Sequence, residues 1–207
     1  MSKKRVLIVF VKNPELGKCK TRLAATIGDQ KAFNFYKNML DRTKEVVEKV
    51  NADKAVFYSS FVDEKDLWPN QDPFYKRLQN QSSDLGTRMQ SAFTDAFKRG
   101  YESVCVIGSD CYAMDAEVIE QAFTVLESKD VVLGPSNDGG YYLLGMNQFH
   151  SELFTSKNWS TESVAPDTIK DFERLGLEFS LLEELIDIDN EEDLRSIPDR
   201  IVEQLLE

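Results

Sequence analysis

The chain has 207 residues, 42% of them hydrophobic and 29% charged, as is usual for one soluble globular domain, here residues 1–207. Thirty-six Asp and Glu against 25 Lys and Arg give a formal net charge of −11, which argues against nucleic acid or an anionic membrane as partner. Three cysteines without metal-ligand spacing argue against a disulfide framework. We therefore expect a cytoplasmic protein without membrane insertion, its oligomeric state open.

Hydrophobic periodicity predicts alternating strands and helices. The apolar run at 6–11 follows basic residues as in a signal peptide, but it is too short and lacks a cleavage site, so it is predicted as the first buried strand. A helix at 29–50 capped by Asp29 follows, and then strands at 55–58 and 74–79 with a turn of helix near 64–68 between them. Next come a helix at 85–99, a strand at 104–107 and a helix at 115–127 capped by Asp115. Strands at 131–133 and 141–145, for the second of which an antiparallel direction is open, precede a helix at 161–175, a strand at 177–181 and a C-terminal helix capped by Asn190. This order predicts an α/β fold, a mostly parallel mixed sheet with helices on both faces.

The loop after the first strand is rich in cations. Lys12, Lys18, Lys20 and Arg22 surround Gly17, and backbone N–H groups at such a turn favour phosphate. It is not a Walker A loop, because a second glycine before Gly17 and a Ser or Thr after Lys18 are missing. In so acidic a chain, this loop indicates phosphate binding rather than a solvated basic turn.

Two apolar strands end in small and acidic residues. Asp110 follows the strand at 104–107, and Asp138-Gly139-Gly140 follows the strand at 131–133. Ligands of open α/β sheets bind beyond such carboxyl ends, where a carboxylate suits a divalent metal and glycines admit a ligand close to the backbone. The alternative for Asp110 is a turn or helix cap.

Asp187 and Asp189 form a second acidic pair, predicted at another strand end, where residues two apart point the same way. For Asp189, metal binding and capping of the next helix are both open. The segment 79–87 could read a nucleobase edge with its amides, although capping by Asp84 is the simpler function.

Several short motifs stand in a recognisable order: Lys12-x-Pro14-x-x-Gly17-x-x-Lys20-Thr21-Arg22-Leu23, Asp84-Leu85-Gly86-x-Arg88-Met89, Gly108-Ser109-Asp110, Gly134-Pro135-x-x-Asp138-Gly139-Gly140-Tyr141-Tyr142, Trp159-Ser160-Thr161 and Asp187-Ile188-Asp189-x-x-Glu192-Asp193-Leu194. With them the chain resembles the nucleotide-diphospho-sugar transferase superfamily, and most closely a family of bacterial and archaeal transferases known as glycosyltransferases or radical-SAM/selenodomain-associated transferases. The resemblance implies a three-layer α/β/α fold of the GT-A type.

The resemblance also implies roles for individual residues. Asp110 and Asp189 would bind Mg²⁺ or Mn²⁺, and Asp110, Lys20 and Asp138 would be catalytic. The nucleotide would be bound by Lys12, Gly17, Lys20, Arg22, Gln81, Leu85 and Gly86. The second substrate would face Asp138, Gly139, Gly140 and Tyr141. Cys111-Tyr112 departs from the small residue and proline expected after the Asp.

Two reactions fit these residues, both with a nucleotide or nucleotide-sugar and a small-molecule acceptor. A glycosyltransferase moves a sugar from an NDP-sugar, with Asp138 as a possible general base if it inverts. A nucleotidyltransferase joins an NTP to a phosphorylated acceptor and releases pyrophosphate. A non-catalytic nucleotide-binding module is the alternative of another class; it would tolerate the loss of Asp110.

Overall fold

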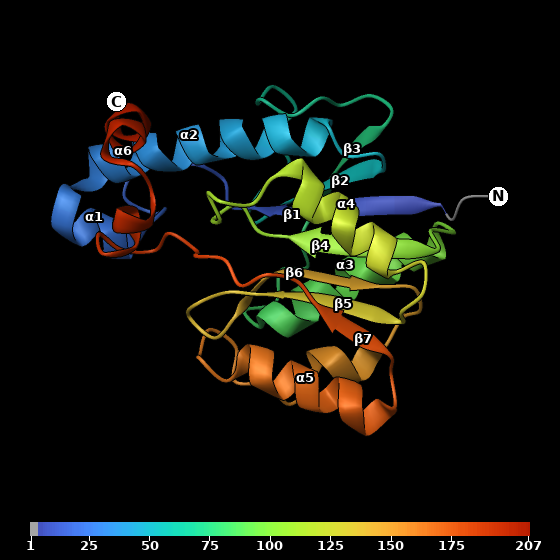
Figure 1. Ribbon diagram of the computed structural model, residues 1–207. Coiled ribbons are helices and arrows are strands. Elements are labelled where there is room, and N and C mark those ends of the chain that lie inside the picture. The colour runs from blue at the N-terminus through green and yellow to red at the C-terminus, as the bar shows by residue number, and fades with distance from the viewer. Residues whose placement is uncertain (1–3) are drawn as a thin grey trace.

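Strands and helices alternate along the chain in the computed structural model, which describes residues 4–207 and so leaves the first three residues of the predicted domain 1–207 outside it (Figure 1). The elements are β1 (Arg5–Val11), α1 (Thr21–Ile27), α2 (Asp29–Glu48), β2 (Asp53–Tyr58), β3 (Phe74–Leu78), α3 (Leu85–Lys98), β4 (Ser103–Ile107), α4 (Ala116–Val125), β5 (Val131–Pro135), β6 (Tyr141–Met146), η1 (Ser151–Phe154), α5 (Val164–Leu175), β7 (Phe179–Leu181), η2 (Asp193–Ser196) and α6 (Asp199–Leu206), where η denotes a 3₁₀ helix.

One seven-stranded sheet has the order β3-β2-β1-β4-β6-β5-β7. All neighbouring strands pair in parallel except β6, which is antiparallel to both β4 and β5. The central strands β1 and β4 are rich in Val and Ile and buried along nearly their whole length, as expected of strands covered on both faces. The predicted mostly parallel mixed sheet is confirmed.

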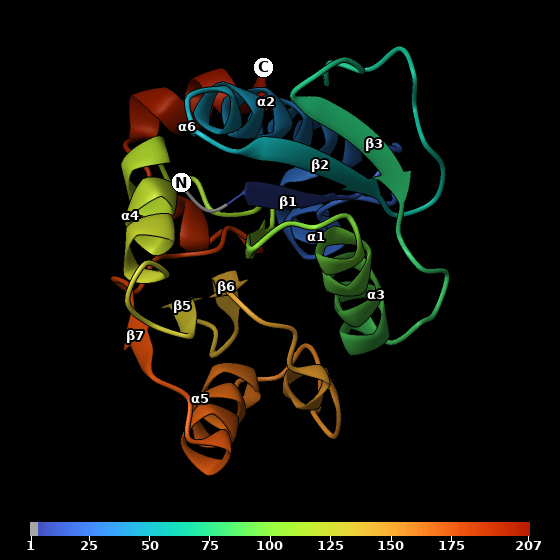
Figure 2. The same cartoon turned by 90° about the vertical axis from the view of Figure 1, so that its right-hand side faces the viewer.

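Helices cover both faces of the sheet (Figure 2). Side chains of α2 and α4 pack on one face, around Leu7, Val9 and Ile107. Side chains of α3 and α5 pack on the other face, around Val6, Ile8 and Val106. Successive side chains of β1 and β4 therefore point into two separate cores, one on each face of the sheet, and the fold has three layers. Within residues 4–207, none of the helices combines the length and apolarity that crossing a bilayer requires.

A third, smaller core joins α1 and α2 to the C-terminal segment. Leu23 of α1 and Phe35 of α2 pack against Ile188, Leu194 and Leu205. The segment after β7 thus returns across the molecule to α1 and α2, as the red and blue ribbons of Figure 1 show.

Most predicted elements are present, with bounds shifted by a few residues, and four details were wrong. The N-cap of α2 is Gly28, and Asp29 is its first residue. Residues 64–68 form turns instead of a helical turn, and 186–189 make only an isolated bridge, at Asp187, instead of a strand. Asn190 accepts hydrogen bonds from the backbone of Glu192 and Asp193 in a turn, while the last α-helix begins at Asp199.

Candidate functional site

A cavity of about 570 Å³ lies over the carboxyl ends of β1 and β4 and the beginning of β6. This volume suits a small molecule of nucleotide size. Because β6 runs against its neighbours, the turn that precedes it reaches the same edge of the sheet as the loops after β1 and β4. Three stretches that are distant in sequence thus meet in one cavity.

The loop after β1 is held in place by buried side chains. Asn13 accepts a hydrogen bond from the Ser60 amide and donates one to the Phe61 carbonyl, so this loop is fixed to the loop after β2. The hydroxyl of Tyr36 accepts from the Lys12 amide and donates to the Lys12 carbonyl. The first residue of the cationic loop is therefore fixed to helix α2, which carries Tyr36.

Lys20 is the buried cation of the site. It adopts left-handed backbone angles, with φ of 48°, directly before α1. Its ammonium lies 2.6 Å from Asp110 Oδ1 and 3.0 Å from Asp189 Oδ1, and it donates to the Ile188 carbonyl oxygen. Burial alone would lower the pKa of Lys20, but the charges of Asp110 and Asp189 outweigh it and raise that pKa. Lys20 is therefore charged at neutral pH.

Further carboxylates gather around this ion pair. Asp187 also lines the cavity, and burial, followed by the charges of Asp110 and Asp138, raises the pKa of Asp187 to about 7. Asp110 and Asp189 remain near half exposed, at 44% and 42% of their side-chain surface. A concentration of negative charge that is open to solvent on one side attracts cations.

Asp138 is fixed within a tight turn between β5 and β6. Its Oδ1 accepts from the Ser136 hydroxyl at 2.6 Å and from the Gly140 amide at 2.8 Å. Within residues 4–207 its other oxygen, Oδ2, has no hydrogen-bond partner and is left for a ligand. Gly139 has φ of +82° and packs so closely on Glu162 that a β-carbon would collide with the Glu162 backbone.

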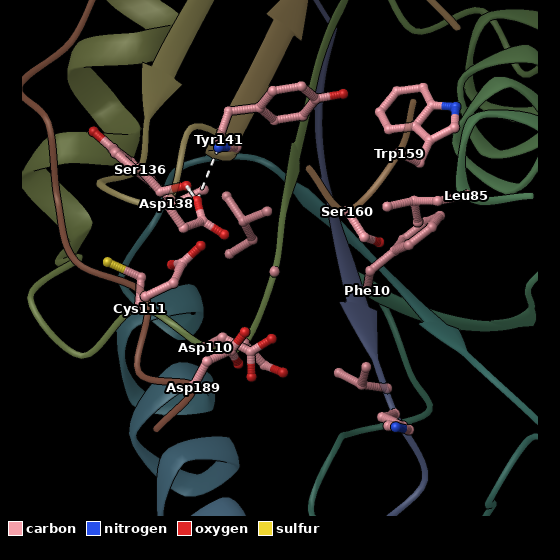
Figure 3. Close-up of a pocket in the computed structure, with 18 of the residues that line it drawn as sticks. Phe10, Leu85, Asp110, Cys111, Ser136, Asp138, Tyr141, Trp159, Ser160 and Asp189 are labelled. Carbon is pink, nitrogen blue, oxygen red and sulfur yellow. Dashed lines mark hydrogen bonds between the residues drawn. The ribbon is translucent and has the colours of Figure 1, made fainter. Parts of the chain in front are cut away.

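The opposite wall of the cavity is apolar. Figure 3 shows Phe10, Leu85 and Trp159 across the cavity from Asp110 and Asp189. Trp159 packs against α3 at Gly86, where a β-carbon would lie 2.5 Å from the indole nitrogen. The cavity therefore has one charged side and one flat apolar side.

Most of the predicted site residues are gathered here. Those that line the cavity are Lys12, Lys20, Arg22, Leu85, Asp110, Asp138, Gly140, Tyr141 and Asp189. Gly17, Gln81, Gly86 and Gly139 are outside the lining: Gln81 is exposed and donates to backbone carbonyls, while Gly86 and Gly139 serve close packing. Their predicted contacts with a ligand stay predictions.

Several lining residues had no predicted role, among them Phe10, Tyr36, Arg88, Trp159 and Ser160. Arg88 and the Trp159-Ser160 pair belong to motifs of the resemblance. Ser160 has φ of 64°, which is unusual for a residue other than glycine, but nothing in the sequence announces it.

The donor set fits a hard divalent cation. One cationic group, the Lys20 ammonium, already lies between oxygens of Asp110 and Asp189, so the two carboxylates are close enough to share an ion. Among residues 4–207 no group of three or more acidic, His or Cys side chains forms a complete metal cage. A cation here would therefore take one or two carboxylates and fill its shell with water and ligand oxygens, as Mg²⁺ commonly does.

Comparison with known proteins agrees with the fold. A family model described as "uncharacterized protein conserved in bacteria" (DUF2064) matches residues 42–161. The crystal structure of a candidate nucleotide-diphospho-sugar transferase from Desulfovibrio desulfuricans G20 is similar with a TM-score of 0.87, covering 99% of this chain and 97% of that chain at 28% identity. No curated protein matches the chain in sequence.

More distant structures share the fold alone. The 4-diphosphocytidyl-2C-methyl-D-erythritol synthase from Anaerococcus prevotii DSM 20548 has a TM-score of 0.59 at 12% identity, covering 97% of this chain and 99% of that chain. Rv0371C from Mycobacterium tuberculosis H37Rv, in complex with manganese, has a TM-score of 0.58 at 10% identity, covering 98% of this chain and 100% of that chain. The predicted resemblance to nucleotide-diphospho-sugar transferases and their fold is confirmed.

Proposed function

This chain belongs to the DUF2064 family, and we propose that it is a metal-dependent transferase that moves a sugar from a nucleotide-diphosphate sugar to a small acceptor. The observation that carries the proposal is the Lys20 ammonium between Asp110 and Asp189, next to a loop rich in cations. Carboxylates for a metal and cations for phosphates are both needed to bind a nucleotide diphosphate.

Asp110 and Asp189 would hold Mg²⁺ or Mn²⁺, and the bound ion would neutralise charge on the donor phosphates. Lys12, Lys20 and Arg22 would bind the phosphate oxygens, since all three line the cavity on the same loop and helix. Their charge stabilises a leaving nucleotide diphosphate, on which negative charge builds up as the bond to the sugar breaks.

Asp138 would bind the acceptor. Its fixed Oδ1 orients the carboxylate, and its unpaired Oδ2 is an acceptor for a substrate hydroxyl. An acceptor hydroxyl held there is positioned to attack, and Asp138 would take its proton if the reaction inverts. Tyr141 and Gly140 line the same side.

Nucleotide-dependent transfer agrees with the names of the structures that share the fold, a nucleotide-diphospho-sugar transferase and a cytidylyl-type synthase. The second name keeps nucleotidyl transfer from an NTP, with release of pyrophosphate, as an alternative. We place glycosyl transfer first because the candidate nucleotide-diphospho-sugar transferase has the far higher TM-score of 0.87.

The test is a melting-temperature screen with NDP-sugars and NTPs, each with and without Mg²⁺, followed by product analysis. A donor at a hundred times its Kd adds about 2.7 kcal/mol, which is roughly 5–10 °C for a domain of this size. Release of an NDP from an NDP-sugar supports the proposal, and release of pyrophosphate from an NTP replaces it with the alternative.

Asp110→Asn should lower kcat/KM by about 100-fold or more, the scale of a lost charge-stabilising group, while the protein stays folded. Asp41→Asn, on the exposed side of α2, is the matched control and should be fully active. Undiminished metal-dependent turnover in Asp110→Asn would remove Asp110 from the site.

A further inference from the structure

The apolar side of the cavity is built to accept a flat ring. Phe10, Leu85 and Trp159 line it, opposite the carboxylates (Figure 3), and Met89 also lines the cavity. A nucleotide has a polyanionic end and a planar end that stacks on apolar and aromatic surfaces. A nucleotide whose phosphates bind at the side of the cations and carboxylates would therefore place its base against this apolar wall. This assignment rests on the proposed function.

One charged residue, Arg88, interrupts this wall. It stands on α3 next to Met89 and one turn beyond Leu85, and it lines the cavity. No carboxylate of residues 4–207 lies within ion-pair distance of Arg88, although the chain has 36 acidic residues. The charge of Arg88 acts on Asp84, the N-cap of α3, but the two side chains form no ion pair.

The guanidinium of Arg88 is also poorly paired by hydrogen bonds. Its Nε is buried and has no partner, and Nη1 makes a single long bond of 3.4 Å to Gln79 Oε1. The Gln79 amide is itself fixed, because its Nε2 donates to the carbonyl oxygens of Val11 and Phe57. Gln79 is therefore a positioning residue that holds the guanidinium at the carboxyl ends of β1 and β2.

A guanidinium offers only donors, in a planar fork, so it pairs best with two adjacent acceptors in one plane. Guanine presents O6 and N7 side by side, and cytosine presents O2 and N3. Adenine places an amino donor beside N7 and N1, and uracil places N3–H between its two oxygens. In both bases a donor would therefore face one of the N–H donors of the guanidinium. We propose that Arg88 reads the base edge and restricts the nucleotide donor to cytosine or guanine nucleotides.

The test measures Kd by calorimetry for CTP, GTP, ATP and UTP, and for inorganic pyrophosphate, all with Mg²⁺. Wild-type protein should bind CTP or GTP about 10-fold or more tightly than ATP and UTP, within the discrimination of a bidentate arginine. Arg88→Lys keeps the charge and loses the fork, and Arg88→Met keeps much of the bulk. Both variants should reduce the preference to less than about threefold and leave pyrophosphate binding unchanged. The control Lys98→Met, on the same helix, should keep the wild-type preference and the wild-type pyrophosphate binding.

Other outcomes overturn the inference in distinguishable ways. Equal binding of all four nucleotides by the wild type, or a preference that survives in both Arg88 variants, removes base reading and leaves the proposed function standing. Loss of pyrophosphate binding in the Arg88 variants makes Arg88 an oxyanion-binding residue instead. Binding of no nucleotide or NDP-sugar by the wild type overturns the proposed function itself. A melting temperature close to that of the wild type establishes that each variant is folded.

Discussion

The Lys20 ammonium lies 2.6 Å from Asp110, and with its two other contacts it has used every N–H that it possesses. The residue predicted to bind phosphate and the carboxylates predicted to bind a metal are thus paired with one another. Lys20 contacts Oδ1 of both carboxylates, so a cation that takes these two oxygens releases Lys20, and a released Lys20 is free to bind phosphate. Binding of the metal and binding of the phosphate should therefore reinforce one another.

Lys20→Gln removes the cation from between Asp110 and Asp189. We expect the variant to lose about 1–3 kcal/mol of unfolding free energy, the usual cost of leaving charged groups unpaired. Millimolar Mg²⁺ should then raise its melting temperature more than that of the wild type, because no ammonium competes for the carboxylates. Lys18→Gln is the control, since Lys18 is 70% exposed and, within residues 4–207, forms an ion pair with Glu15 alone. An equal Mg²⁺ response in Lys20→Gln and wild type would contradict the competition.

Gly86→Ala tests the contact between α3 and the loop that carries Trp159. The new β-carbon would lie 2.5 Å from the indole nitrogen of Trp159 and would also collide with the Phe154 carbonyl oxygen. Overpacking of this kind costs about 1–3 kcal/mol, and each kcal/mol lowers the melting temperature by roughly 2–4 °C at this size. Ser91→Ala, at an exposed position of the same helix, should change the melting temperature little. A Gly86→Ala protein as stable as wild type would show that the loop carrying Trp159 can move aside without loss of stability.

Asp171→Asn should destabilise the protein in a pH-dependent way. Burial alone would raise the pKa of Asp171, but hydrogen bonds and charges from Lys157 and Arg174 outweigh it and lower that pKa. A carboxyl whose pKa is lowered by folding stabilises the folded state at pH values above its pKa in the unfolded chain, about 3.9. This stabilisation is lost as the pH falls through the pKa of the folded state. The variant also leaves the Lys157 ammonium, 2% exposed, without its partner.

The unfolding free energy of Asp171→Asn should therefore be about 3 kcal/mol lower than that of wild type at neutral pH, with the difference shrinking toward acid pH. Denaturant titrations over a pH series measure this. Asp167→Asn, which removes the partner of the exposed Lys170 on the same helix, is the matched control with little expected effect. A pH-independent difference for Asp171→Asn would rule out the ion pair as its cause.

The cysteines should be unreactive in the folded protein. All three are buried; burial, with the Asp187 charge adding to it, raises the pKa of Cys111 to about 12, and burial raises the pKa of Cys19 and Cys105. Since the thiolate is the reactive form, a thiol reagent near pH 8 should find no fast-reacting group until denaturant is added, when all three should react. A rapid native reaction that Cys111→Ser abolishes would instead mark Cys111 as accessible from the cavity.

The sheet was largely predictable from the sequence, because its central strands are buried on both faces and form short apolar runs between turn residues. Asp84 and Asp115 were predicted as caps and are caps, since a single residue with its own backbone decides that interaction. By contrast, α1 was missed, because its buried residue, Leu23, depends on α2 and on a segment far along the chain.

The candidate site likewise contains residues that the sequence predicts and residues that only the folded chain reveals. Lys12, Asp110 and Asp138 follow strands directly, so the rule that loops at the carboxyl ends meet was enough to gather them. Gln81 is two residues beyond the buried Gln79, and only the hydrogen bonds of the folded chain distinguish the two amides. Arg88 is distinguished by its buried Nε, which has no hydrogen-bond partner among residues 4–207, and no sequence pattern reveals this.

Lys20 and Asp189 are separated by 169 positions, and this separation orders events during synthesis. At roughly 5–20 residues per second, a ribosome needs about 8–34 s to add the residues between them. Until then Lys20 has neither Asp189 nor the Ile188 carbonyl, and the small core that α1 shares with the returning segment is missing one side. A nascent chain can thus pair β1 with β4 before Lys20 gains Asp189 and the Ile188 carbonyl, so the ion pair at the centre of the candidate site is completed late.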